Sequence, residues 1–183
     1  ENGKKLIQPC TDCIYDGDIS PGQFYAMDHP PNAIDDYGYS KRLFAEAASK
    51  INDPNVKTIR ASIIGFDKNE VSLLSWFLKH SKNNTSCNGY TNHFWNGITT
   101  LQWARIAAHV IEYWDKYPSL TVAATEPISK FELLTKIAKA FNINTTIAAV
   151  EHPKTKNKCL QSNFSCSSIE NQLHDLKSFT ENL

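Results

Sequence analysis

Residues 56–65, VKTIRASIIG, decide the fold of this chain of 183 amino acids. They are rich in β-branched residues and end at a glycine, which is typical of a buried strand. The segment before them predicts a helix over 36–50, because its apolar residues recur at helical spacing: Leu43, Phe44, Ala47, Ala48 and Ile51. Before that helix, the apolar run at 6–10 predicts a strand that ends in a loop at Thr11. This order of strand, helix and strand indicates an α/β protein with parallel pairing.

The rest of the chain continues the alternation. Its patterns predict strands over 120–124 and 145–150. They also predict helices over 70–82 and 129–141, a helix that begins at Thr99 or Thr100, and a final helix that begins at residue 167. The starts of the last two helices carry capping boxes, SKFE at 129–132 and SSIE at 167–170. We expect residues 83–97, which are polar and aromatic, to be irregular.

Composition limits the classes of function. Nineteen basic and nineteen acidic residues give a net charge of zero, so nucleic acid and anionic membrane surfaces are not expected partners. No apolar run approaches the ~20 residues of a membrane helix. Five cysteines, an odd number, suit a reducing compartment, and we expect a cytoplasmic protein. The chain opens without Met or a signal region, so we expect it to be a piece of a longer protein.

Tyr37 and Lys41 form the most suggestive pair of polar residues. They are four residues apart, so a helix places both side chains on one face. An ammonium beside a phenol lowers the phenol's pKa and brings it into the range of general acid–base catalysis. The alternative is an ordinary pair of solvated side chains.

A second group follows the predicted strand at 6–10. Thr11 would lie at the carboxyl end of a parallel strand, where open α/β sheets bind ligands, and its hydroxyl could contact a reacting carbonyl. The alternative is that Thr11 and Asp12 only satisfy the backbone of a turn. Cys10 and Cys13 could also form a metal or redox site, but no second Cys-x-x-Cys completes the four ligands that structural zinc needs.

Three segments, TDCIYDG at 11–17, YGYSK at 37–41 and IRASIIG at 59–65, resemble in order and spacing the extended short-chain dehydrogenase/reductases of the dTDP-4-dehydrorhamnose reductase type. Residues 95–100 and 126–130 are similar to the substrate-binding lobe of that family. The resemblance implies the C-terminal part of a Rossmann-type doubly wound parallel sheet. Residues 1–65 would end that core, and residues 66–183 would form mainly a smaller α/β substrate-binding lobe with some strands returning to the core.

The resemblance also implies roles for individual residues. Tyr37 would protonate the oxygen of a 4-keto sugar as hydride arrives from NADPH or NADH, and Lys41 would lower the pKa of Tyr37 and bind the nicotinamide ribose. Thr11 would orient the carbonyl, with Asp12 in a supporting role. Three further residues complete the expected site: Ser62 for the cofactor, Trp95 for the substrate, and Lys158 near the nucleotide's phosphates, where an ordinary surface lysine is the alternative.

Two departures from the family pattern stand out. Phe44 and Ala45 replace the family's usual Gly-Glu after the Tyr-x-x-x-Lys motif. The seven glycines are also too far apart for a Gly-x-Gly-x-x-Gly loop, which holds the pyrophosphate of a dinucleotide. The family carries that element upstream of the point where this chain begins.

The expected partner is a nucleotide-sugar, the expected cofactor is NADP or NAD, and no metal is expected. The oligomeric state stays open, with a homodimer as one option. The alternative function is a non-catalytic regulatory subunit that binds a nucleotide-sugar or a dinucleotide. The β subunit of methionine adenosyltransferase, which is similar to these reductases, is an example, because a fold does not imply an activity.

Overall fold

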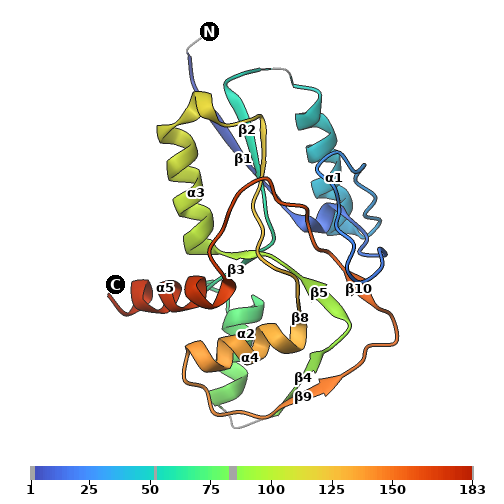
Figure 1. The fold of residues 1–183 in the computed structure, drawn as a ribbon, viewed down its shortest axis with the longest axis vertical. Coiled ribbons are helices and arrows are strands. Elements are labelled where there is room, and N and C mark those ends of the chain that lie inside the picture. Colours follow the sequence, from blue (N-terminus) through green and yellow to red (C-terminus); the bar gives the residue numbers. More distant parts are fainter. Residues whose placement is uncertain (1–2, 52, 83–85, 183) are drawn as a thin grey trace.

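The computed structural model of the chain describes residues 3–51, 53–82 and 86–182. Its elements form two stacked lobes (Figure 1). The helices alternate with strands, and most of the strand pairs are parallel. The α/β class with parallel pairing is thus confirmed.

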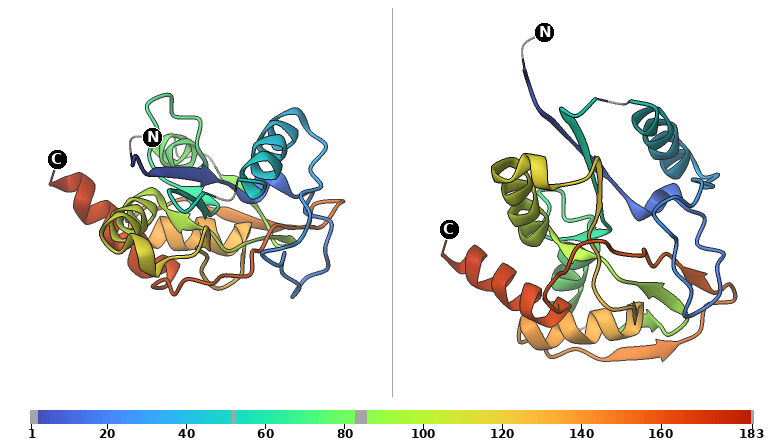
Figure 2. Two further views of the ribbon diagram at one scale, coloured as in Figure 1. Left: turned by 90° about the horizontal axis from the view of Figure 1, so that it is seen from above. Right: turned by 45° about the horizontal axis from the view of Figure 1, so that its top comes forward.

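The upper lobe of Figure 1 is a parallel sheet with the strand order β1-β2-β7. Its strands are β1 (Leu6–Cys10), β2 (Val56–Arg60) and β7 (Leu120–Val122). Helix α1 (Asp36–Ser49) covers one face, and helix α3 (Thr100–Glu112) covers the other (Figure 2). The register aligns Cys10 with Arg60 and Arg60 with Val122, so the carboxyl ends of the three strands meet at one edge.

The lower lobe packs short strands against three helices. The helices are α2 (Leu73–Lys82), α4 (Lys130–Ala140) and α5 (Ile169–Glu181). Its strands form the sheet β10-β5-β8 and the pair β4-β9, with β4 (Cys87–Tyr90), β5 (His93–Trp95), β8 (Ile128–Ser129), β9 (Ile147–Val150) and β10 (Lys156–Asn157). The remaining elements are the pair β3 (Ile63–Ile64) and β6 (Ile98–Thr99) and two 3₁₀ turns, η1 (Asp12–Ile14) and η2 (Trp114–Lys116).

Three predicted helix starts are confirmed by their caps. The Asp35 side chain accepts from the backbone N of Gly38 at 2.9 Å, and Thr99 accepts from Gln102 at 3.2 Å. At the start of α4, Ser129 and Glu132 form the reciprocal capping box. Each cap satisfies backbone donors that the first helical turn leaves without partners.

Several predicted boundaries were wrong. The strand expected up to residue 64 breaks after Arg60, and β3 pairs separately with β6. Helix α2 begins at Leu73, because the Asp67 carboxylate accepts from the backbone N of Asn69, Val71 and Ser72 and holds the preceding residues in a loop. The N-cap of α5 is Ser168, one residue after the predicted one.

The prediction that residues 83–97 are irregular was also wrong, because they contain β4 and β5. Residues 83–85 of that segment lie outside the described residues. Strand β4 pairs with β9, whose first residue is sixty positions later in the chain: Cys87 with Ile147.

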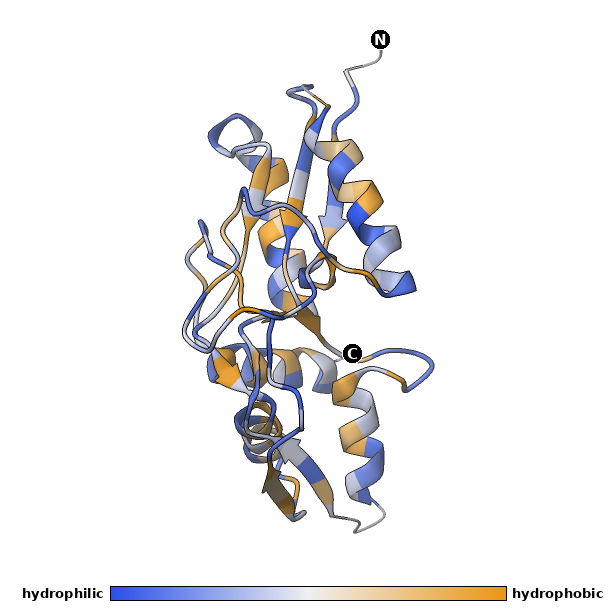
Figure 3. Ribbon diagram, turned by 90° about the vertical axis from the view of Figure 1, so that its right-hand side faces the viewer, coloured by the Kyte–Doolittle hydropathy of each residue, from blue (hydrophilic) through white to orange (hydrophobic). Residues whose placement is uncertain are grey.

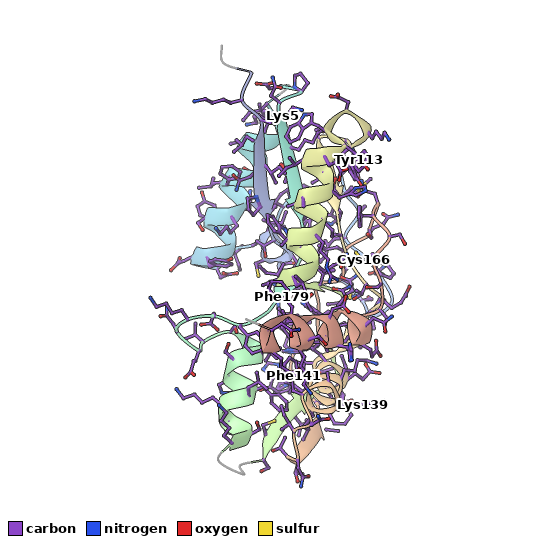
Figure 4. The ribbon with its side chains drawn as sticks, turned by 90° about the vertical axis from the view of Figure 1, so that its left-hand side faces the viewer. Lys5, Tyr113, Lys139, Phe141, Cys166 and Phe179 are labelled. Carbon is purple, nitrogen blue, oxygen red and sulfur yellow. The ribbon has the colours of Figure 1, made fainter. Side chains whose placement is uncertain are left out.

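The core consists of three apolar clusters, one on each face of the upper sheet and one in the lower lobe. Along the helices, hydrophobic and hydrophilic residues are interleaved, as expected where one side packs on a core (Figure 3). None of the described helices has the length and apolar character to cross a membrane.

Candidate active site

Helix α1 places Tyr37 and Lys41 on one face, as their spacing predicts. The Lys41 Nζ atom lies 5.5 Å from the centroid of the Tyr37 ring. Both side chains are exposed, and the Tyr37 side chain lies in the first turn of the helix, next to the Asp35 cap. The ammonium therefore contacts the ring face of the phenol.

Gly38 brings this first turn against the segment after β1. A Cβ atom at Gly38 would lie 2.5 Å from the carbonyl oxygen of Cys13 and 2.7 Å from the Cβ of Ala33. Such distances are below any real carbon contact, so only glycine allows this approach. The contact places Tyr37 beside the carboxyl end of β1 and the turn η1.

Thr11 and Asp12 occupy that strand end and form a connected polar group. The Thr11 hydroxyl donates to Asp12 Oδ1 at 3.0 Å and accepts from the backbone N of Cys13 at 3.1 Å. Asp12 is only 4% exposed. The Thr11 hydroxyl is thus both the cap of η1 and the partner of a buried carboxylate, so the turn-forming role expected as an alternative is present.

The pKa of Tyr37 is raised from its ordinary value, opposite to the expected direction. Burial is the largest cause, followed by the charges of Cys13 and Asp12. Lys41, whose ammonium lies over the ring, is not among the groups that shift this pKa. At neutral pH the phenol is protonated, as an ordinary tyrosine is, and the raised pKa makes it a weaker proton donor.

Two lysines approach the same group from the lower lobe. Lys130 follows Ser129, which pairs with Phe94 of β5, and the backbone N of Lys158 donates to the Phe94 carbonyl at 3.2 Å. Lys130 and Lys158 therefore lie on opposite sides of Phe94 in β5. Burial lowers the pKa of Lys130, and the charge of Asp12 opposes this effect. The charge of Lys158 acts on Cys13.

Neither ammonium is neutralised by a neighbour. Within residues 3–51, 53–82 and 86–182, neither Lys130 nor Lys158 has a carboxylate within 4.0 Å. The Lys130 Nζ atom instead lies 5.4 Å from the centroid of the Trp95 ring. Two cations beside the single carboxylate of Asp12 give this end of the site a net positive charge.

Ser62 and Trp95 contact each other rather than Tyr37. The indole Nε1 of Trp95 donates to the Ser62 hydroxyl at 2.7 Å, and Trp95 is 4% exposed. A buried ring with its N–H already paired is a packing residue. Trp95 reaches the site only through Lys130, which lies over its ring.

The cysteines of the predicted Cys-x-x-Cys pair are free thiols, as are the other three: Cys87, Cys159 and Cys166. Burial raises the pKa of Cys13, and the charge of Asp12 raises it further. Burial also raises the pKa of Cys159 to about 12. Across the described part of the chain, no three His, Cys, Asp or Glu side chains gather as a metal site would require.

A cavity of about 560 Å³ is lined in part by Lys130. It is also lined by Trp76, His80, Tyr90 and His93, among others. The rings of Trp76 and His80 stack at 5.2 Å, and those of Tyr90 and His93 lie 4.8 Å apart. This size and aromatic lining are typical of pockets for planar organic ligands. Lys130 joins the cavity to the group around Asp12.

A larger cavity, about 950 Å³, lies elsewhere, between the segment 124–128 and the start of α5. It includes none of the predicted site residues. Its lysine, Lys136, is paired with Glu170. We therefore place the candidate site at the end of β1 and not in the largest cavity.

The structure thus brings together five of the predicted residues, Thr11, Asp12, Tyr37, Lys41 and Lys158, and leaves Ser62 and Trp95 apart. The sequence patterns did not predict that Lys130 and Cys13 lie at this site. One feature of the sequence points to Lys130. A cation in the first turn of a helix is destabilised by the helix dipole, so a lysine at this position indicates a role other than helix stability.

A family model described as "RmlD substrate binding domain" matches residues 1–183. No curated protein sequence matches the chain.

Solved structures share the fold at low sequence identity. A dTDP-4-dehydrorhamnose reductase from Bacillus anthracis, in complex with NADP, is 19% identical with a TM-score of 0.80, over 98% of this chain and 66% of its own. The Clostridium acetobutylicum reductase is 14% identical, with a TM-score of 0.78 over 97% and 66%. The dTDP-glucose 4,6-dehydratase from Bacillus anthracis, in complex with NAD, is 14% identical, with a TM-score of 0.73 over 97% and 62%. These matches confirm the Rossmann-like fold, and the chain spans about two thirds of their length.

Proposed function

Because the chain belongs to the RmlD substrate-binding domain family, we propose that it forms the reducing site and the nucleotide-sugar lobe of an NAD(P)-dependent sugar-nucleotide reductase. The reaction would be the reduction of a 4-keto group on a nucleotide-activated deoxysugar. The observation that carries the proposal is the packing of the first turn of α1 against the polar end of β1, with Lys41 over the ring of Tyr37. A proton donor, a cation and a hydroxyl at one strand end are the groups that carbonyl reduction needs.

Tyr37 is the proposed acid. The phenol is protonated at neutral pH, so it can give its proton to the oxygen that becomes the new hydroxyl, and its raised pKa works against this transfer. Thr11 is the proposed orienting residue. Its hydroxyl proton now points to Asp12, and it would turn to the substrate's carbonyl when that group arrives.

The cofactor fits one part of this site. Lys41 is exposed on the same face as Tyr37 and makes no ion pair with any described residue, so these two side chains could hold a nicotinamide ribose. Bound NADPH or NADH would supply the hydride. The Ser62 hydroxyl, which accepts from Trp95, is a weaker contact for it.

Lys130 and Lys158 are the proposed contacts for the diphosphate of the substrate. Their two ammonium groups can pair with the two negative charges that the diphosphate of a nucleotide-sugar carries. The adjoining cavity with Tyr90 and His93 would then hold the nucleobase by stacking. In this arrangement residues 1–65 contribute the chemistry and residues 66–183 contribute mainly substrate binding.

A second function is a regulatory subunit that binds the same ligands without turnover. The raised pKa of Tyr37 favours this alternative, because an ammonium placed to activate the phenol would lower it. The two functions differ in whether bound NADPH is consumed.

The test uses the full-length gene product that contains this chain. Calorimetry measures binding of NADPH and of a dTDP-4-keto-deoxysugar, and absorbance measures NADPH oxidation. Binding with oxidation supports the reductase. Binding without oxidation supports the regulatory subunit, and the absence of nucleotide-sugar binding would contradict both.

A further inference from the structure

Arg60 is a buried cation outside the site described above. It is the last residue of β2, lies between Cys10 of β1 and Val122 of β7, and is 7% exposed. Its Nη1 donates to the Tyr15 hydroxyl at 2.8 Å and to the Met27 carbonyl at 3.2 Å. Both acceptors are neutral.

The guanidinium is incompletely satisfied. Its Nε atom has no hydrogen-bond partner and is fully buried, so a ligand can reach only the rest of the guanidinium. No carboxylate of the described residues lies within 4.0 Å of the guanidinium. Buried charges in proteins are normally paired, because removing an ion from water without a partner is costly. An unpaired buried arginine therefore calls for an anion that is not part of the described chain.

Arg60 lines a cavity that has room for such an anion. The cavity measures about 350 Å³ and lies between α1 and the upper sheet. Its lining is mainly apolar, with Phe44, Ala48, Val56 and Leu120 around the space. Since a water molecule takes about 30 Å³ in the liquid, the space holds on the order of ten waters or a ligand of similar size.

The apolar character of the lining determines which anions the cavity can bind. A phosphate or a small inorganic ion is strongly hydrated and would gain nothing from an apolar wall. A carboxylate with an alkyl or aryl body can pair with Arg60 and bury its apolar part against α1. We propose that this cavity is a second ligand site, which binds a small monocarboxylate with its carboxylate on Arg60 and its apolar body against Phe44 and Ala48.

Asp28 is the one acidic residue of the lining, and it is exposed. Its carboxylate would repel a bound anion, so it weakens the site without filling it. Replacing Asp28 with Asn should therefore strengthen the binding of a carboxylate. An Arg60 that needed only Asp28 as its counter-ion would give no such gain.

The experiment titrates the full chain with hexanoate and follows the backbone amide signals by NMR. Hexan-1-ol, which has the same chain without the charge, tests the role of Arg60, and inorganic phosphate tests the role of the apolar wall. We expect hexanoate to bind with a Kd of about 1 mM and to shift the amides around the cavity, with hexan-1-ol and phosphate at least about tenfold weaker.

Two variants in helix α1, Ala48→Leu and Ala47→Leu, leave Arg60 unchanged and keep the test independent of folding. Arg60→Gln removes the cation but also the bonds to Tyr15 and Met27, so it can fail to fold. Ala48→Leu fills the cavity and leaves Arg60 intact, and we expect hexanoate to bind at least about tenfold more weakly to it. Ala47→Leu, on the exposed side of the same helix, is the control and should bind like the unchanged chain.

Four results would overturn the proposal. The first is no binding at a hexanoate concentration of about ten times the expected Kd. The second and third are binding of hexan-1-ol, or of phosphate, as tight as that of hexanoate. The fourth is unchanged hexanoate binding in Ala48→Leu. Tighter binding in Asp28→Asn supports the proposal, and unchanged binding there would contradict the placement of the carboxylate.

Discussion

The Tyr37 hydroxyl makes no hydrogen bond to any described residue, so its setting comes from the groups packed around it. Those groups are the buried Asp12, the thiol of Cys13 and, across the ring, the ammonium of Lys41. Asp12 affects several of its neighbours at once, because its charge raises the pKa of Tyr37, Cys13 and Cys159. A change at this one carboxylate should therefore be measurable at more than one side chain.

Asp12→Asn should make the Cys13 thiol more reactive. Burial and the Asp12 charge both raise the pKa of Cys13, so removing the charge increases the thiolate fraction at any pH below that pKa. We expect alkylation of Cys13 by iodoacetamide at about pH 8 to become several-fold faster. Mass spectrometry of the labelled peptides gives the rate for each cysteine.

Cys166 is the internal control for that experiment. Burial raises its pKa to about 11, and Asp12 does not contribute. Its labelling rate should stay the same in the variant. If Cys13 is labelled no faster, or if both cysteines speed up together, then Asp12 does not act on the site as described.

At the scale of elements, the site depends on the contact between the first turn of α1 and the turn η1. Gly38→Ala should separate them, because the new Cβ would overlap the Cys13 carbonyl. We expect a loss of about 1–3 kcal/mol in the free energy of unfolding, as for other overpacked positions. Denaturation in urea measures it.

Ala47→Ser, on the exposed side of α1, is the matched control and should change stability by less than about 0.5 kcal/mol. The displaced Tyr37 should also lose the influence of Asp12 and Cys13. Equal stability of Gly38→Ala and the unchanged chain would show that α1 does not need this close approach.

The elements that sequence analysis predicted well are those with local signals. Asp35, Thr99 and Ser129 cap their helices through bonds to residues three positions later, so the pattern lies within four residues. The Tyr37–Lys41 pair has the same short range. Their positions follow from the chemistry of one helical turn.

Other features depend on contacts between distant parts of the chain. The roles of Trp95 and Lys130 follow from bonds and ring contacts across the fold, such as the bond from Trp95 to Ser62, 33 residues away. No periodicity reports such a contact. The expected direction of the Tyr37 pKa failed for the same reason, because spacing predicts that Lys41 is near but not that Asp12 and Cys13 are also near.

At the scale of the whole molecule, ion pairs join the loop after β1 to the segment around β10. Asp18 accepts from Lys154 at 2.8 Å and from Lys156 at 2.7 Å, across more than 130 residues. These two bonds lower the pKa of Asp18 from 3.8 to about 2. They bring the loop after Thr11 to the same side as Lys158.

Asp18→Asn should therefore change the acid sensitivity of the fold. The stabilising effect of the Asp18 carboxylate is fully present above its unfolded pKa of 3.8, and it is lost as the pH falls towards about 2. We expect the unchanged chain to lose more stability between pH 5 and pH 2 than the variant does, with the pH dependence followed by thermal unfolding. Parallel curves for the two proteins would exclude this link between the lobes.

The central claim is that Tyr37 donates the proton in a hydride transfer to a sugar-nucleotide carbonyl. The most direct measurement compares Tyr37→Phe with the unchanged protein, both as the full-length gene product, for NADPH oxidation with a dTDP-4-keto-deoxysugar. We predict a fall in kcat of about 10²–10⁴-fold with nucleotide-sugar binding preserved, since phenylalanine keeps the ring and lacks the hydroxyl that donates the proton. Turnover within about twofold of the unchanged protein would contradict the claim.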